Sequence, residues 1–326
     1  MPLLEVKSLT VDYRSSRGTV RAVEDVSFSL EKGETLGLAG ESGSGKSTLG
    51  LSIIRLTPVP GRIVKGQIKI DGTDVLKLSE DRMRVIRGQK VAYIFQDPMT
   101  SLNPVKKIGA HFVELMQAHE PNTKKEDALE RAKTVLNNLG ILTERMNDYP
   151  HQFSGGMRQR IMIGLAIALN PVLVIADEPT TALDVIVQAK ILDLLESLRK
   201  TYGMALILIS HDLSIILERC DRIIVMYGSY IVEYADSTEL YKNPIHPYTQ
   251  GLLRSIPNIE LADQKLSAIP GSPPNMLNPP KGCRFWPRCE NTKIICKSKE
   301  PSLVNVGNNH FVRCFSPPEE GAKDIE

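Results

Sequence analysis

The sequence lacks a long apolar run and carries almost no net charge. Its strongest apolar runs, such as residues 161–169, fall far short of the roughly 18 residues that a membrane-spanning helix needs. Its 40 Lys and Arg nearly balance 38 Asp and Glu, so the net charge of +2 gives no argument for binding nucleic acid or an anionic membrane surface. The 326 residues suit about two domains, or one large domain with an appendage.

Cysteine is also scarce, with five residues in the whole chain. The first residues, Met1 to Glu5, run straight into a strand pattern, so we expect no signal peptide and a cytoplasmic protein. Disulfides do not persist in the cytoplasm, and the cysteines therefore indicate a metal site or chance rather than a disulfide framework. Any role at a membrane would then come through a protein partner.

The most specific motif is a glycine-rich loop at residues 40–47. It reads Gly-Glu-Ser-Gly-Ser-Gly-Lys-Ser, and it lies between a predicted strand at 34–39 and a predicted helix at 47–56 with apolar residues at core spacing up to its end. Glycines let the loop N–H groups point at phosphate oxygens, beside the positive end of a helix dipole. Lys46 would reach the β- and γ-phosphates, and the Ser47 hydroxyl would hold Mg²⁺. A plain glycine turn is the alternative, but strand, helix, lysine and serine all in register predict a site for a nucleoside triphosphate.

The rest of the chain alternates strand and helix patterns. The first 35 or so residues alternate apolar and polar side chains, which is typical of antiparallel strands. Strand patterns recur, with helical patterns between several of them, and this favours an α/β fold with a parallel sheet. Residues 98–169 are mostly helical, with a polar break at 120–123, and are interpreted as an inserted helical subdomain. The recurring strand patterns lie at residues 67–70, 91–95, 172–176, 205–209 and 223–227.

Three parts are predicted along the chain. Residues 1–240 would form a nucleotide-binding domain, and residues 241–280 a helix and a proline-rich connector. Residues 281–326 would form a small C-terminal extension that carries four of the five cysteines.

Two carboxylates follow the apolar run at residues 172–176. A buried strand would place Asp177 at its tip, where it would hold the magnesium shell. Glu178, one residue further, would polarise the attacking water as a general base. A solvated strand edge is the alternative interpretation.

Residues 153–159, Phe-Ser-Gly-Gly-Met-Arg-Gln, resemble the signature motif of the ATP-binding-cassette (ABC) ATPases, with Phe153 and Met157 departing from the common Leu-Ser-Gly-Gly-Gln. Other motifs follow that family's order: Tyr13 resembles its adenine-stacking residue, Gln96 its glutamine loop, Ala182-Leu183-Asp184 its dimer loop and His211 its switch histidine. Taken singly these are weak, since a lone histidine or tyrosine is more often structural. The resemblance implies a P-loop NTPase of RecA-like fold, an ABC nucleotide-binding domain with an antiparallel β subdomain and an inserted helical subdomain. The residues assigned to ATP binding are Tyr13, Gly40, Glu41, Ser42, Gly43, Ser44, Gly45, Lys46, Ser47, Thr48, Gln96, Ser154, Gly155, Gly156, Asp177 and Asp184, with Glu178, His211 and Gln96 assigned to catalysis and Ser47, Gln96 and Asp177 to Mg²⁺.

The signature motif also opens an apolar helix. The free N–H groups of Ser154, Gly155 and Gly156 would form a second anion site, which one nucleotide does not need from one chain. In the family that the chain resembles, this second site comes from a partner subunit, and two ATPs are enclosed in a head-to-tail dimer. Closure of the dimer would then drive mechanical work, because the dimer interface is complete only when the γ-phosphate is present.

Two further stretches indicate a branch of the family. Residues 97–104, Asp-Pro-Met-Thr-Ser-Leu-Asn-Pro, and residues 243–253 resemble the peptide and nickel importer ATPases. The resemblance implies a peripheral subunit on the cytoplasmic face of the cell membrane, paired with a second, identical or similar ATPase. It implies two integral membrane permease subunits and, indirectly, an extracytoplasmic peptide-binding protein. Uptake of dipeptides or oligopeptides is the leading function; nickel or another small solute, or a non-transport ABC ATPase, are the alternatives.

Four cysteines, Cys283, Cys289, Cys296 and Cys314, lie within 32 positions near the C-terminus. Structural zinc usually shows tight C-x₂₋₄-C pairs, and none is present, whereas open all-cysteine spacing suits an iron–sulfur cluster. We favour a [4Fe–4S] cluster that clamps the extension, with Zn²⁺ as the alternative. The basic residues around these cysteines are interpreted as a solvated face, and no nucleic acid is expected. Cys220 stands apart and is predicted to be a buried apolar residue.

Overall fold

The structure is a computed structural model that describes residues 1–97, 101–181, 183–256, 268–316 and 323–324. It divides into two units. The first unit contains Met1–Leu3, Glu31–Glu34 and Ile70–Ile207, and the second contains Leu4–Leu30, Thr35–Lys69 and Leu208–Glu326. Among the described residues, no helix is both long enough and apolar enough to cross a membrane.

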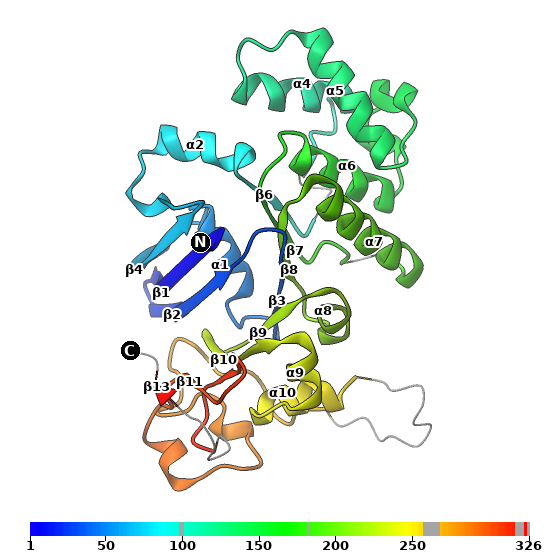
Figure 1. The fold of residues 1–326 in the computed structure, drawn as a ribbon. Coiled ribbons are helices and arrows are strands. Elements are labelled where there is room, and N and C mark those ends of the chain that lie inside the picture. The colour runs from blue at the N-terminus through cyan, green and yellow to red at the C-terminus, as the bar shows by residue number, and fades with distance from the viewer. Residues whose placement is uncertain (98–100, 182, 257–267, 317–322, 325–326) are drawn as a thin grey trace. The chain divides into compact units, whose positions relative to one another are not determined.

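The first unit combines a small parallel sheet with a group of helices. Its strands have the order β8-β7-β6, and β6 (Val91–Ile94) pairs in parallel with β7 (Leu173–Asp177). The residues between these two strands form the predicted helical insertion, whose helices α4, α5 and α6 lie together in Figure 1. The elements of this unit are β5 (Thr73–Asp74), η1 (Val75–Lys77), α2 (Glu80–Gln89), β6, α4 (Ile108–His119), α5 (Lys125–Asn138), η2 (Thr143–Asn147), η3 (Pro150–Gln152), α6 (Gly155–Ile167), β7, α7 (Val185–Tyr202) and β8 (Ala205–Ile209), which runs on into the second unit.

Gly164 allows three helices of the insertion to meet. A Cβ atom at this position of α6 would lie 2.5 Å from Leu139 Cδ1 and 3.1 Å from Val135 Cγ1, both at the end of α5. It would also lie 3.4 Å from the ring of Phe112 in α4. Phe112 is fully buried, so the helical insertion has a core of its own.

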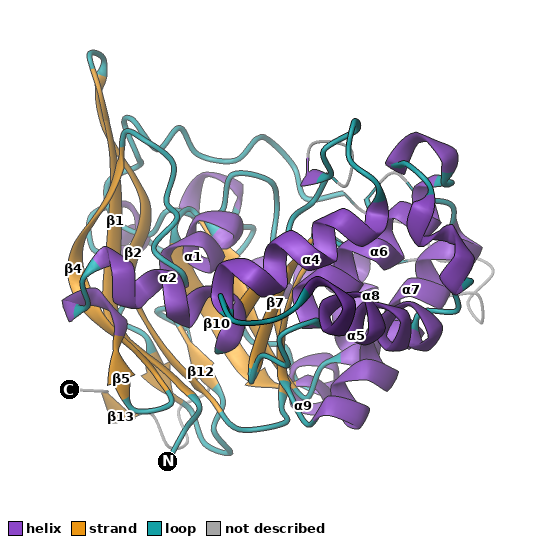
Figure 2. Ribbon diagram, turned by 90° about the horizontal axis from the view of Figure 1, so that it is seen from above, coloured by secondary structure: helices purple, strands orange, loops and turns teal. Residues whose placement is uncertain are grey.

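The second unit contains two sheets. Its antiparallel strands β1 and β2 pair from Leu4 opposite Leu30 to Ser15 opposite Gly18, and β4 adds to β1. These long strands run side by side in Figure 2. The second sheet has the order β13-β11-β12-β10-β9-β3, with β3 parallel to β9. The elements are β1 (Leu4–Ser15), β2 (Gly18–Leu30), β3 (Thr35–Ala39), α1 (Lys46–Ile53), β4 (Gly61–Ile70), α8 (Leu213–Arg219), β9 (Arg222–Tyr227), β10 (Tyr230–Asp236), α9 (Ser237–Lys242), α10 (Pro247–Arg254), η4 (Trp286–Arg288), η5 (Ile294–Lys297), β11 (Val304–Asn305), β12 (Phe311–Val312) and β13 (Lys323–Asp324).

Most predicted elements are confirmed, and one helix boundary is wrong. Helix α1 ends at Ile53 rather than at residue 56, because Arg55 adopts a left-handed backbone with φ 54° and turns the chain. Leu56, expected on the core face, is 43% exposed. Cys220 is buried at the end of α8, as predicted.

Residues 281–316, the cysteine-bearing segment, pack more tightly than their sequence suggests. Strand β12 pairs with β10, so the segment extends the sheet that contains β3. Val312 and Phe285 are buried, and the Phe285 ring lies edge-on to Tyr227, with the ring centroids 5.1 Å apart. Two-residue strands carry no readable periodicity, which explains why the sequence gives no sign of this pairing.

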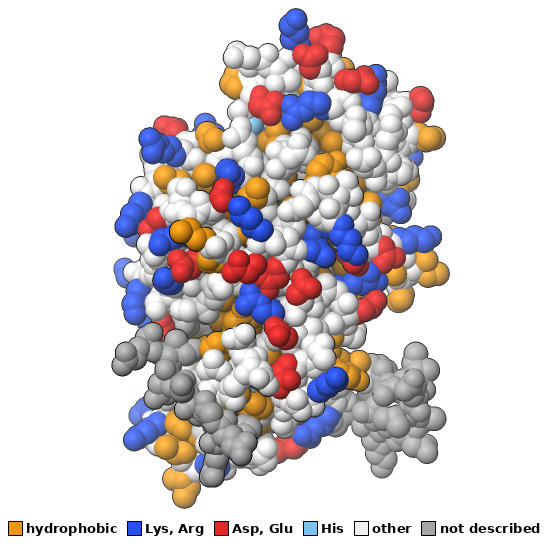
Figure 3. Space-filling view, in the orientation of Figure 1, with side chains coloured by type: hydrophobic (Ala, Val, Ile, Leu, Met, Phe, Trp, Pro, Cys, Tyr) orange, Lys and Arg blue, Asp and Glu red, His pale blue; other side chains and the backbone are white. Residues whose placement is uncertain are grey.

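On the face drawn in Figure 3, acidic and basic side chains are intermixed.

Candidate functional site

The glycine-rich loop joins β3 to α1 within the second unit. Gly40 and Gly45 adopt φ values of 143° and 106°, which L side chains rarely reach. A Cβ atom on Gly40 would lie 2.2 Å from the Met226 carbonyl oxygen, and one on Gly45 would lie 2.2 Å from the Ala22 carbonyl oxygen. Only glycine fits either position. The loop backbone therefore packs closely against these carbonyl groups. Helix α1 begins at Lys46, within one residue of the predicted start.

Lys46 is buried inside this loop. Its side chain is held by the loop's own backbone, since Nζ donates to the Gly40 carbonyl at 2.7 Å and to the Glu41 carbonyl at 2.9 Å. The Ser44 hydroxyl lies 3.4 Å from the same nitrogen. This geometry holds a positive charge at the concave side of a loop rich in backbone N–H groups, which is the arrangement that binds phosphate oxygens.

Glu41, a variable position of the motif, is anchored from the C-terminal part of the chain. Its N–H donates to Tyr248 Oη at 2.8 Å, and its carboxylate accepts two hydrogen bonds from Arg288, at 2.6 and 2.9 Å. Burial raises the pKa of Tyr248. Sequence reasoning missed both contacts, because the partners lie more than 200 positions away; Tyr248 belongs to the importer-like stretch at 243–253, and Arg288 belongs to no recognised motif.

Helix α10 carries Tyr248 and is itself fixed by buried polar groups. His246 caps its start, since Nδ1 accepts the Tyr248 N–H at 3.1 Å. Burial lowers the pKa of His246 to about 4, so the imidazole is neutral and acts as an acceptor. The Glu233 carboxylate accepts the backbone N–H groups of Ile245 and His246 and also lies 2.7 Å from His310 Nε2. Strand β10 and the cysteine-bearing segment are thereby tied to the start of α10.

The remaining predicted residues of the second unit are more open. Tyr13, on β1, is half-buried and lies against Gly61, where an added Cβ would come within 2.7 Å of its ring. Ser47 and His211 are exposed, and Thr48 is half-buried. Their roles in nucleotide binding stay predictions.

Within the first unit, the acids at the end of β7 have defined partners. Tyr93 Oη donates to Asp177 Oδ2 at 2.7 Å, and Asp177 is only 7% exposed. Burial, together with the Asp177 carboxylate, raises the pKa of Tyr93, so its hydroxyl remains a donor. The Asp177 side chain is therefore held in place at the strand tip by the Tyr93 hydroxyl. Nothing in the sequence indicates Tyr93 as its partner.

Gln96 and Glu178, both assigned to catalysis from the sequence, contact each other directly, a contact that the sequence does not predict. Gln96 Nε2 donates to Glu178 Oε2 at 3.0 Å, and Thr181 Oγ1 donates to the same oxygen at 2.9 Å. Glu178 has a left-handed backbone with φ 45°, an uncommon conformation that is often found at functional sites. The Gln96 and Thr181 side chains thus both orient the Glu178 carboxylate.

The signature motif begins helix α6. Ser154 is its N-cap and is exposed, and its Oγ accepts the Met157 N–H at 3.4 Å. An added Cβ on Gly156 would lie 2.6 Å from Val187 Cγ1 of α7, so this glycine permits the close approach of two helices. Asp184 caps α7 by accepting the Val187 N–H at 2.9 Å. The helix N-terminus predicted as an anion site is present, but its ligand stays a prediction.

The departures from the common signature have a packing explanation. Phe153 is buried, and the Arg145 guanidinium lies 4.0 Å from the centre of its ring. Arg145 also contacts the Met157 sulfur at 3.6 Å. A large apolar residue is thus required at position 153, and phenylalanine meets that need as leucine would. Ala182 of the predicted dimer loop, and Pro98, Met99 and Thr100 of the importer-like stretch, lie outside the described residues.

The four late cysteines face a common cavity. Cys283, Cys289, Cys296 and Cys314 all line a space of about 160 Å³, together with residues of η4 and the start of α10. Burial, together with the neighbouring cysteines, raises the pKa of Cys283 to about 11. Burial also raises the pKa of Cys314. Among the described residues, however, no three His, Cys, Asp or Glu side chains are grouped as a site for a metal ion. The assignment of metal ligands therefore stays a prediction.

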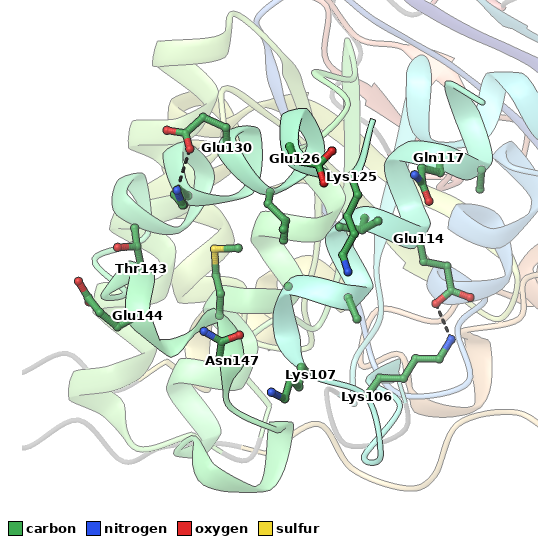
Figure 4. Close-up of a pocket in the computed structure, with 17 residues that line it drawn as sticks. Lys106, Lys107, Glu114, Gln117, Lys125, Glu126, Glu130, Thr143, Glu144 and Asn147 are labelled. Carbon is green, nitrogen blue, oxygen red and sulfur yellow. Dashed lines mark hydrogen bonds and ion pairs between the residues drawn. The ribbon is translucent and has the colours of Figure 1, made fainter. Parts of the chain in front are cut away.

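A much larger cleft lies in the helical insertion (Figure 4). It encloses about 1280 Å³ between α4, α5 and η2, and its lining mixes acidic and basic side chains. Several of these form ion pairs with each other, such as Lys106 with Glu114 at 2.6 Å and Lys133 with Glu130 at 2.8 Å. The predicted nucleotide residues are not among those that line it.

A glycine loop that encloses a buried lysine at a strand–helix junction defines a P-loop nucleotide-binding protein. Sequence comparison matches residues 23–181 to the ABC transporter family and residues 232–296 to the oligopeptide/dipeptide transporter C-terminal region. The chain is 46% identical over 317 residues to the oligopeptide transport ATP-binding protein OppD of Bacillus subtilis, covering 96% of this chain and 88% of that protein. It is 42% identical over 325 residues to the dipeptide transport ATP-binding protein DppD of Escherichia coli, covering 99% of each.

Solved structures agree with this assignment. The ATP-binding cassette MJ0796, reported as a dimer and also as a dimer bound to ADP and Pi after hydrolysis, is 28% identical with a TM-score of 0.64. It covers 72% of this chain and 98% of its own. The chain therefore belongs to the ABC transporter ATPases, in the group of the oligopeptide and dipeptide transport ATP-binding proteins. Proteins of this family are ATPases coupled to transport.

Proposed function

We propose that this chain is the ATP-hydrolysing subunit of an ABC importer that takes up dipeptides or oligopeptides across the cytoplasmic membrane. The observation that carries the proposal is the buried Lys46 enclosed by the glycine loop, in a chain whose full-length relatives are named for peptide transport. A motor of this kind needs a phosphate site whose shape depends on the nucleotide.

Each predicted residue then has a role in ATP hydrolysis. Lys46 and the loop N–H groups would bind the phosphates, and the Tyr13 ring would stack on adenine. Ser47, Asp177 and Gln96 would hold Mg²⁺, which supplies charge neutralisation between the β- and γ-phosphates. Glu178 would accept a proton from the attacking water.

Two observations support these assignments. Asp177 is buried and ordered by Tyr93, and Glu178 is oriented by Gln96 and Thr181. Carboxylate and hydroxyl oxygens are the ligands that Mg²⁺ prefers, so the chemistry of these side chains fits the ion. His211, exposed after β8, would sense the γ-phosphate as the family's switch histidine.

The working unit would be a pair of ATPases. The exposed N-terminus of α6 at Ser154 has the donors for a second phosphate contact, and MJ0796 forms a dimer. Two integral membrane permeases would receive the motion, and a peptide-binding protein outside the membrane would deliver the cargo. The chain would then lie on the cytoplasmic face of the membrane as a peripheral subunit.

This assignment is tested by gentle purification of the chain from membranes of its native host. We expect two integral membrane proteins to copurify in fixed proportion, because a peripheral ATPase must bind the permeases that it drives. Copurification of nucleic acid in place of membrane proteins would contradict an importer role and favour a non-transport ATPase.

We also propose that the cysteine cavity holds a [4Fe–4S] cluster. The cavity of about 160 Å³ far exceeds the roughly 10–15 Å³ that is needed to hold a single water molecule, and all four late cysteines line it. A cubane cluster needs its four ligands spread around a larger body than one ion does. Zn²⁺ is the alternative, and would require the thiols to close in.

Anaerobically purified protein should be brown and contain about four iron and four sulfide per chain. Replacing Cys283, Cys289, Cys296 or Cys314 by serine should remove the colour, because the hydroxyl is a poor ligand for iron. Cys220→Ser is the matched control and should keep it, since Cys220 is buried beside Gly37 and Ile216, away from the cavity. Colourless protein with one zinc per chain would overturn the cluster, and metal-free folded protein would overturn any metal site.

A further inference from the structure

The cysteine-bearing segment contacts the phosphate loop through one arginine. Arg288 ends the short helix η4, and its side chain is 5% exposed. Both of its terminal nitrogens donate to the Glu41 carboxylate, at 2.6 and 2.9 Å. Nε donates to the Pro270 carbonyl at 2.8 Å, in the proline-rich connector. A paired, bidentate arginine of this kind fixes both position and orientation of the carboxylate that it binds.

Every polar group of Glu41 makes a hydrogen bond that holds this residue in place in the loop. Its carbonyl accepts from Lys46 Nζ, its N–H donates to Tyr248, and its carboxylate accepts from Arg288. The position of Glu41 therefore bears directly on where the Lys46 ammonium lies. Two of the three anchors come from beyond residue 240, outside the part of the chain that contains the nucleotide motifs.

The charge of Glu41 makes this contact matter for phosphate binding. A carboxylate beside a site for a triphosphate repels the ligand unless a cation neutralises it. Hydrogen bonding to Glu41 raises the pKa of Arg288 further above its usual value, so the guanidinium stays charged. Without Arg288, the half-buried Glu41 would carry an uncompensated charge within the phosphate loop.

We infer that Arg288 is a positioning residue for ATP binding: it neutralises and orients Glu41, and so makes the shape of the phosphate loop depend on the cysteine-bearing segment. The inference rests on the proposed ATP site. The next residue, Cys289, lines the cysteine cavity. The residue that binds Glu41 of the phosphate loop is therefore adjacent to one that lines the cavity.

The test is the dissociation constant of MgATP for the full chain, measured by calorimetry, with ATP hydrolysis measured in parallel. Arg288→Met should raise the dissociation constant by about tenfold or more, the size expected when charge-assisted hydrogen bonds are lost. KM for ATP should rise more than kcat falls, because the affected contact acts on ground-state binding. The double variant Arg288→Met with Glu41→Gln should bind more tightly than Arg288→Met alone, because the amide leaves no unpaired charge.

Arg284→Met is the matched control. Arg284 belongs to the same segment and is similarly buried, but it donates to Glu24 at β2, to the Gly228 carbonyl and to Tyr230. It should leave the dissociation constant within about twofold while loosening the segment to a similar degree. The inference fails if Arg288→Met binds MgATP as the parent chain does, if Arg284→Met weakens binding equally, or if the double variant Arg288→Met with Glu41→Gln binds no more tightly than Arg288→Met alone. Failure of the parent chain to bind MgATP would instead refute the proposed function.

Discussion

Glu178→Gln should abolish nearly all ATP hydrolysis and leave ATP binding intact. The amide keeps the size of the side chain, and its oxygen still accepts from Gln96 and Thr181, so the local structure should persist. It does not accept a proton from the attacking water, and losses of a general base are typically about 10²–10⁴-fold. We therefore expect kcat to fall by that factor while the dissociation constant of MgATP stays close to that of the parent chain. The variant should also accumulate as an ATP-bound dimer, visible by size-exclusion chromatography.

Thr181→Val serves as the control for this experiment. It removes one hydrogen bond to the Glu178 carboxylate but keeps the carboxylate itself. Its loss of kcat should be far smaller, because Thr181 only orients the base. Near-normal turnover by Glu178→Gln would remove Glu178 from the role of general base, and equal losses in both variants would point to a disturbed loop instead.

Ser154→Arg should block ATP-driven dimerisation and leave ATP binding by the monomer intact. Ser154 is exposed at the N-terminus of α6, so an arginine there would project from the surface that the proposal assigns to the partner's nucleotide. The loss of the N-cap hydrogen bond should cost only about 1 kcal/mol of stability. Dimerisation should fall below detection by light scattering, while MgATP binding to the monomer stays within about twofold.

Two comparisons isolate the role of the signature motif. Ser79→Arg is a matched control, because Ser79 is also an exposed N-cap, on α2, and accepts the Arg82 N–H at 3.4 Å. It should leave dimerisation unchanged. Lys46→Ala should weaken ATP binding or abolish productive positioning of the phosphates, because it removes a phosphate counter-charge. A mixture of Lys46→Ala with Ser154→Arg should rebuild one intact site and recover part of the activity. Loss of ATP binding by monomeric Ser154→Arg would show that Ser154 acts within its own chain.

Local motifs were predictable from sequence because neighbouring residues determine them. The glycine loop, with its strand and helix, required only the spacing of residues 40–47. The family's order of motifs pointed to Gln96 and Glu178 as separate site residues, but their direct contact was not predicted. Cys220 was placed correctly because an apolar residue at the end of a short helix has few other options. The end of α1 was misplaced because Leu56 fits a helical period that the chain abandons at Arg55.

Contacts between distant segments were not predictable. Tyr93 with Asp177 and Arg288 with Glu41 join residues far apart in the chain, and each member is ordinary in its own sequence context. The pairing of β12 with β10 depends on two-residue strands that no periodicity reveals. Such contacts are set by how the elements pack, which an isolated sequence does not encode in any local pattern. Of these contacts, the one between Arg288 and Glu41 ties the cysteine-bearing segment to the phosphate loop.

The most direct test of the account is uptake of a labelled dipeptide by proteoliposomes containing the transporter copurified with this chain. The peptide-binding protein and the dipeptide are supplied on one side and MgATP on the other. We predict accumulation that requires MgATP at the face where this chain lies and that disappears when the chain carries Glu178→Gln. Accumulation that continues with Glu178→Gln, or without MgATP, would contradict the claim that ATP hydrolysis by this chain drives peptide uptake.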